Sequence, residues 1–166
     1  MNVEQLRAAQ APLKARYKTD SASALVIMHA QGVPDVPEQV CRVETQIGIA
    51  SAGLHPAAGG DGTQACSGDM LLQALVACAG VTLGAVATSM GIAVRGGRIS
   101  AAGEVDFRGT LGVSREAAVG FKNITLSFEL DTDASPETLA KLLELTERYC
   151  VVYQTLKHPP ELRAAR

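Results

Sequence analysis

The stretch that decides the fold is SGDMLLQALVAC, residues 67–78, which opens the longest uncharged segment of the chain. From residue 70 to residue 94, 25 positions carry no charge, and apolar side chains recur at helical spacing. Ser67 and Asp69 suit the start of a helix, and Gly91 suits its end. The pattern predicts one long helix over about residues 67–90. Because it is apolar on every face, we expect it to be buried on every side.

This helix is also long enough to span a bilayer, and Gly80 and Gly84 form a GxxxG pair. Polar residues such as Gln73 and Thr82 interrupt the segment, however, and it has neither an aromatic belt nor a basic flank. The small residues favour close helix–helix contact in a soluble core, including contact across a dimer axis. We therefore expect no membrane span.

The flanking segments predict strands and shorter helices. Upstream we expect a helix over residues 2–11 that ends near Pro12 and a strand pair around Tyr17 and residues 25–28, closed by a turn at 31–37. A strand at 40–47 and a loop over 48–65 follow. Downstream we expect two paired strands at 99–108 and 119–131. A helix opened by Ser135, Pro136 and Glu137 leads to Cys150, and a short helix then runs to Lys157.

No repeat or linker interrupts this order, so the pattern predicts a single α+β domain over residues 1–166. Within it, residues 1–58 supply the N-terminal helix and strands. Residues 59–166 supply the core helix, the strand pair and the helix that leads to Cys150.

Composition excludes several classes of function. The 166 residues carry a net charge of −2, without the basic surface that nucleic acid requires. The N-terminus has no secretory signal, so we expect a cytoplasmic protein with four reduced cysteines. No CxxC pair occurs, and the three histidines are scattered, so we expect no metal site. Nothing in the pattern indicates a bound cofactor.

Two of the cysteines, Cys78 and Cys150, are candidates for a chemical role. Cys78 lies in the middle of the long helix, where it is either a small buried side chain or a nucleophile. The nucleophilic interpretation needs a positive group or dipole that stabilises the thiolate, and a second thiol that resolves the sulfenic acid. Cys150 lies at a helix boundary, where backbone N–H groups are free to assist. We expect Cys41 to be a core residue and Cys66 to have no chemical role.

Four stretches resemble the OsmC/Ohr family, the osmotically inducible and organic hydroperoxide resistance proteins. Residues 67–78 resemble the family's SPxELLLAALAAC helix start, preceded by the glycine-rich residues 59–62. Residues 91–94 resemble the segment that follows the family's long helix. Residues 149–156, YCVVYQTL, resemble its second cysteine motif. The similarity extends over about residues 59–162.

The resemblance implies a fold and an activity. The fold would be OsmC-like, with antiparallel sheets wrapped around two long central helices in an intertwined homodimer. Cys78 would be the peroxidatic thiolate that attacks organic hydroperoxides, and Cys150 would resolve it by forming a disulfide. An external dithiol of lipoyl type would regenerate the pair, in an oxidative stress response. The alternative is a non-catalytic dimer of the same family that binds a small molecule or senses redox state.

The chain also departs from the family pattern. The acid that positions a thiolate-activating arginine is replaced by Gly68, with Asp69 one residue later, a rotation of about 100° on a helix. Arg16 is the expected activating arginine, and Arg42 is a weaker candidate. Val151 replaces the proline that usually follows the second cysteine. These differences concern the activity more than the fold.

Overall fold

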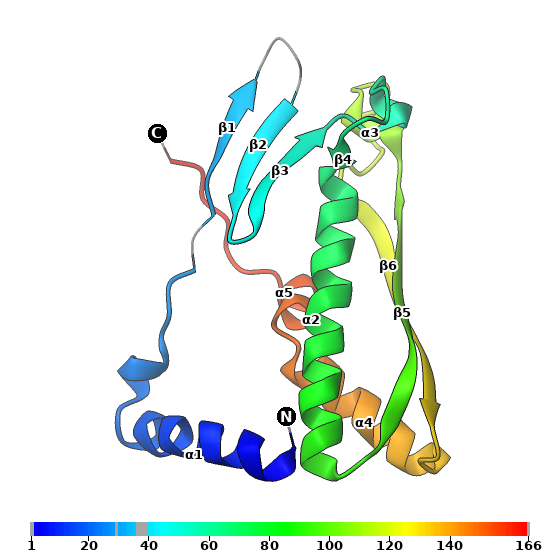
Figure 1. Cartoon of the computed structure of the whole chain (residues 1–166). Coiled ribbons are helices and arrows are strands. Elements are labelled where there is room, and N and C mark those ends of the chain that lie inside the picture. Colours follow the sequence, from blue (N-terminus) through cyan, green and yellow to red (C-terminus); the bar gives the residue numbers. More distant parts are fainter. Residues whose placement is uncertain (1, 29, 36–39, 166) are drawn as a thin grey trace. The chain divides into compact units, whose positions relative to one another are not determined.

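The computed structural model describes residues 2–28, 30–35 and 40–165, without the side chains of residues 34 and 40. These residues form an α+β fold with two sheets (Figure 1). The helices are α1 (Val3–Thr19), α2 (Ser67–Met90), α3 (Phe107–Thr110), α4 (Pro136–Tyr149) and α5 (Val151–Lys157), with short 3₁₀ turns at Ser21–Ala24 and Pro56–Ala58. One sheet has the order β1 (Gly32–Asp35), β2 (Val40–Thr45), β3 (Gly48–Gly53) and β4 (Ala65–Cys66), and the other pairs β5 (Val94–Val105) with β6 (Phe121–Thr132).

The chain divides into two compact units, each assembled from separated segments. The first unit comprises residues 1–26, 74–100 and 127–166, and contains both Cys78 and Cys150. The second comprises residues 27–73 and 101–126, and contains the four-stranded sheet.

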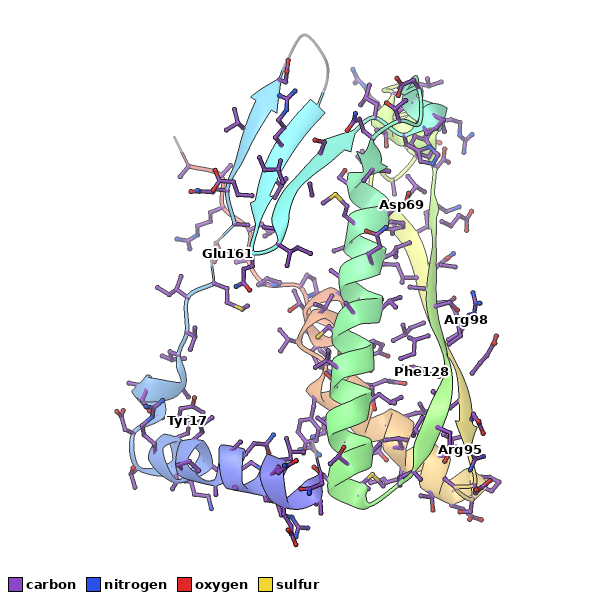
Figure 2. All side chains as sticks on the ribbon, in the orientation of Figure 1. Tyr17, Asp69, Arg95, Arg98, Phe128 and Glu161 are labelled. Atoms are coloured by element: carbon purple, nitrogen blue, oxygen red, sulfur yellow. The ribbon has the colours of Figure 1, made fainter. Side chains whose placement is uncertain are left out.

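The core of the first unit forms where α4 packs against α2. Leu142 of α4 is fully buried against Leu83 and Ala87 of α2. Half-buried apolar side chains close this cluster, and they include Phe128 of β6, labelled in Figure 2. The alternation predicted for β6 is confirmed, since every second side chain from residue 124 to residue 130 is half-buried. The packing of α4 in this core determines where its C-terminal end, and therefore Cys150, lies.

The long helix is confirmed at residues 67–90, and it ends at Gly91 as expected. Gly91 has φ +69°, and the Ile92 N–H donates to the Ala87 carbonyl, as in a Schellman cap. The expectation of burial on every side is wrong for the single chain. The buried residues form one stripe, namely Leu75, Ala79, Leu83 and Ala87. Val81, on another face, is 77% exposed. By length and composition α2 passes as a membrane span, but one such helix is weak evidence, because the core helix of a soluble protein passes the same test.

Of the strands in the four-stranded sheet, the sequence predicts only β2. The strand predicted at 40–47 is β2, which ends at Thr45, and Ile47 is 99% exposed in the turn that follows. Residues 48–53, expected in a loop, form β3, which pairs antiparallel with β2 and parallel with β4. The loop prediction was wrong because Gly48–Gly53 has little β-propensity of its own, and its pairing supplies the stability.

The N-terminal predictions also need correction. Pro12 lies inside α1, which continues to Thr19 and includes Tyr17, so no strand forms there. Residues 25–28 form no strand either, whereas residues 32–35, expected in a turn, form β1. β1 accommodates Pro34 because it is the edge strand of its sheet, where a missing N–H costs little. Residues 36 and 37 of the predicted turn lie outside the described residues.

The remaining predictions are confirmed with small changes of boundary. The paired strands predicted at 99–108 and 119–131 are β5 and β6. β5 begins at Val94 and ends at Val105, earlier at both ends than predicted, and β6 begins at Phe121 and ends at Thr132. Ser135 caps α4 by accepting a hydrogen bond from the Thr138 N–H at 3.2 Å, with Pro136 in the first turn. The four-residue helix α3 was not predicted from the sequence.

Candidate functional site

Cys150 occupies a break of a single residue between two helices. Its N–H donates to the Thr146 carbonyl as the last bond of α4, and its carbonyl accepts from the Gln154 N–H as the first bond of α5, both at 2.9 Å. Its own backbone is extended, with φ −74° and ψ 110°. The Cys150 Sγ accepts a hydrogen bond from the Tyr153 N–H at 3.5 Å, so the sulfur occupies the place of an N-cap side chain. The thiol is therefore fixed in orientation and fully buried.

The break in the helix leaves backbone N–H groups free for Cys78. Burial by itself raises the pKa of the Cys78 thiol. Hydrogen bonds from the Val152 N–H, the Cys150 thiol, the Val151 N–H and the Thr82 hydroxyl outweigh this effect and hold the pKa below its usual value. The structure thus brings together the two cysteines that the sequence singled out.

The pKa of the Cys150 thiol shifts in the opposite direction and is raised. Burial raises the pKa of its thiol, the Tyr153 N–H opposes this, and the hydrogen bond and negative charge of Cys78 raise it further. Because the two thiols interact, the lowered pKa of Cys78 and the raised pKa of Cys150 are linked. The pair therefore consists of a more acidic thiol on α2 beside a less acidic thiol that donates a hydrogen bond to it.

This asymmetry predicts the order of alkylation. In reduced protein titrated from low to high pH, we expect iodoacetamide to modify Cys78 at lower pH than Cys150, since the thiolate is the reacting form. Quantifying the two modified peptides by mass spectrometry measures the two midpoints. Modification of Cys150 before Cys78 would contradict the order of the two pKa values.

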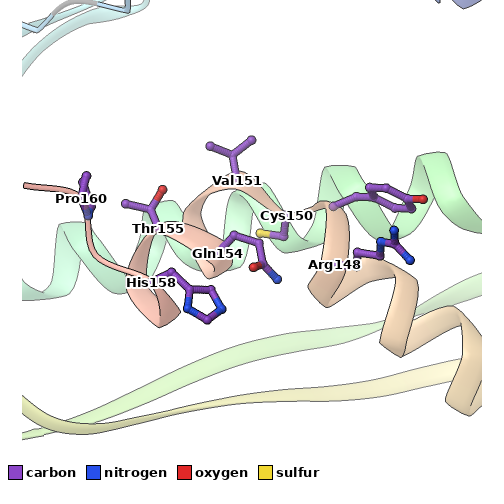
Figure 3. A pocket seen from close by; sticks show the side chains of 8 residues that line it. Arg148, Cys150, Val151, Gln154, Thr155, His158 and Pro160 are labelled. Atoms are coloured by element: carbon purple, nitrogen blue, oxygen red, sulfur yellow. The ribbon is translucent and has the colours of Figure 1, made fainter.

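A shallow pocket of about 520 Å³ opens beside the second cysteine (Figure 3). It lies at the junction of α4 and α5, and basic, polar and apolar side chains all contribute to it. The lining residues are Arg148, Tyr149, Cys150, Val151, Gln154, Thr155, His158 and Pro160. A small molecule in this pocket would lie next to Cys150.

The other two predicted site residues, Arg16 and Asp69, are not among the groups that shift the pKa of the Cys78 thiol. Arg16 lies on α1 with its guanidinium over the Tyr17 ring, 5.3 Å from the ring centroid. Asp69 lies in the first turn of α2 (Figure 2). Arg42 pairs with Asp35 at 2.9 Å. Among the described residues, none of the groups that act on the Cys78 thiol is an arginine. The roles of Arg16 and Asp69 stay predictions.

Sequence reasoning missed the groups that stabilise the thiolate. Thr82 follows Cys78 by four residues, so helical spacing places both on one face, and this signal could have identified it. The N–H groups of Val151 and Val152 carry no such signal, because they become free only where the helix breaks. In the described part of the chain, no group of three or more metal-ligating side chains is present.

The fold and the interacting thiols define an α+β protein with a site of two paired cysteines. The sequence profile of the OsmC-like proteins matches residues 60–164, more than half of the chain. The chain belongs to the OsmC family. A comparison with curated protein sequences gave no match.

Solved structures agree with this assignment. An OsmC-like protein from Mycoplasma pneumoniae superposes with a TM-score of 0.68 at 14% identity, covering 81% of this chain and 89% of that one. An organic hydroperoxide resistance protein from Elizabethkingia anophelis gives 0.61 at 14% identity, covering 81% and 91%. The organic hydroperoxide resistance protein OhrB of Bacillus subtilis gives 0.55 at 15% identity, covering 81% and 93%. At these identities, the likeness establishes the fold.

Proposed function

We propose that this protein is a thiol-dependent peroxidase that reduces organic hydroperoxides. The observation that carries the proposal is the Cys78–Cys150 pair, with the more acidic thiol on α2 and the less acidic thiol hydrogen-bonded to it. Family membership and the hydroperoxide resistance proteins among the similar structures support the same chemistry.

The proposed cycle has three balanced steps. The Cys78 thiolate attacks the terminal peroxide oxygen, the O–O bond breaks, and the alkoxide takes a proton to leave as an alcohol. Cys78 is then a sulfenic acid, and Cys150 attacks its sulfur to form a disulfide, so that the sulfenic oxygen leaves as water. A dithiol of lipoyl type reduces the disulfide by exchange and is itself oxidised to a cyclic disulfide. A soluble, cytoplasmic location would suit this cycle, because thiols stay reduced there between turnovers.

The direct test uses reduced protein, cumene hydroperoxide and dihydrolipoamide. We expect catalytic loss of peroxide that requires both the protein and the dithiol. The pocket beside Cys150 favours a second candidate, a protein that binds a small molecule or senses redox state without turnover. Oxidation of Cys78 by one equivalent of peroxide, with no further consumption when dithiol is supplied, would favour that alternative.

The proposal includes a homodimer. A stripe of small side chains on α2 is exposed in the single chain, namely Ala74, Ala77, Val81 and Gly84. A second copy of the chain would cover this apolar stripe, and the small residues would let two helices approach closely.

A substitution on this stripe tests the dimer. We expect Val81→Glu to convert a dimer into a species of half the mass, because a carboxylate cannot be buried unpaired in an apolar interface. Light scattering after size-exclusion chromatography measures the mass. Val113→Glu is the matched control, since Val113 is 72% exposed and lies outside the stripe. A monomeric wild-type protein would refute the dimer.

A further inference from the structure

Two side-chain hydrogen bonds from α5 to Glu147 of α4 span the helix break at Cys150. The Tyr153 hydroxyl, on α5, donates to the Glu147 carboxylate at 2.8 Å. The Gln154 side-chain amide, also on α5, donates to the Glu147 backbone carbonyl at 2.9 Å. Two neighbouring residues of α5 therefore form hydrogen bonds to one residue of α4, and Cys150 is the single extended residue between the two helices.

One of these contacts replaces a backbone hydrogen bond that the helix break removes. If α4 continued through Cys150, the Val151 N–H would donate to the Glu147 carbonyl. The break instead gives the Val151 N–H to the sulfur of Cys78. The carbonyl left without its helical partner is satisfied by the Gln154 amide, so the break leaves no orphaned acceptor at Glu147.

Tyr153 is itself held in place on two sides. Its ring lies under the Lys157 ammonium, with the nitrogen 5.5 Å from the ring centroid. The hydrogen bond to the Glu147 carboxylate raises the pKa of the Tyr153 hydroxyl, which therefore stays a donor. Its backbone N–H meanwhile donates to the Cys150 sulfur. One residue thus connects the end of α4, the break and the resolving thiol.

We propose that Tyr153, acting through Glu147, is a positioning residue that holds the first turn of α5 so that its N–H groups meet the sulfur of Cys78. The Tyr153 side chain is not among the groups that shift the pKa of Cys78, so it acts on that thiol through the break. The consequence for turnover rests on the proposed peroxidase function, whereas the positioning itself does not.

The test measures alkylation of Cys78 by iodoacetamide across a pH series, without peroxide, in Tyr153→Phe, Glu147→Ala and Glu147→Gln. We expect Tyr153→Phe and Glu147→Ala to raise the midpoint by about half a pH unit to one unit, the effect of weakening one hydrogen bond. Glu147→Gln keeps an oxygen acceptor for Tyr153 and should stay near the wild-type midpoint. The Tyr153→Phe/Glu147→Ala double variant should shift no further than either single variant, because both remove one interaction.

Glu144→Ala is the matched control, because Glu144 lies on α4 and forms an exposed ion pair with Lys141. It should keep the wild-type midpoint. A wild-type midpoint in Tyr153→Phe, or an equal shift in Glu144→Ala and Glu147→Ala, would overturn the inference. If Tyr153→Phe does not fold, as judged by circular dichroism, the difference between Glu147→Ala and Glu147→Gln decides it. A wild-type protein without peroxidase turnover refutes the proposed function alone, since the alkylation profile needs no peroxide.

Discussion

Replacing Cys78 by serine should reduce peroxide consumption to the uncatalysed rate. A serine hydroxyl is not ionised near neutral pH and is a poor nucleophile towards peroxide, whereas the Cys78 thiolate is stabilised by the turn at Cys150. The measurement is loss of cumene hydroperoxide with dihydrolipoamide as reductant. Turnover that survives Cys78→Ser would end the peroxidase proposal.

Replacing Cys150 by serine should also stop turnover, but it should leave Cys78 over-oxidised. In Cys150→Ser the first oxidation should still occur, but position 150 no longer supplies a thiol to resolve the sulfenic acid. Turnover should stop, and Cys78 should accumulate as sulfinic and sulfonic acid, which mass spectrometry detects. Cys66→Ser is the control, because Cys66 lies at the end of β4, in the other compact unit, and should leave turnover unchanged. Cys78 that remains unoxidised in Cys150→Ser would contradict the order of the two steps.

The second large effect concerns stability. Leu142→Ala should lower the free energy of unfolding by about 2–5 kcal/mol, because it leaves a cavity in the core between α4 and α2. Leu142 is fully buried and contacts the cluster that contains Leu83 and Ala87. Urea denaturation at fixed protein concentration measures the change. Leu162→Ala, at an 89% exposed position, should change the free energy by less than about 0.5 kcal/mol. Equal losses in the two variants would refute this account of the core.

The sequence predicted best where one pattern extended over many residues. The helix at 67–90 and the alternation in β6 are long periodic signals, and both are confirmed. It predicted worst near the N-terminus, where β3 is made of Gly48–Gly53 and β1 contains a proline. These strands have weak local propensity and exist because partners pair with them, so no local pattern could have indicated them.

For the site, the sequence by itself singled out the two cysteines that the structure brings together. Cys78 was identifiable from the motif around it, and Cys150 from its place between two helical segments. Only the tertiary structure decided what activates Cys78. The pKa of a thiol depends on the groups around the sulfur, and two of these are backbone N–H groups that any residue can supply. They act on Cys78 because the core packing of α4 and the hydrogen bonds to Glu147 hold the break beside α2. No single segment of the chain encodes this arrangement.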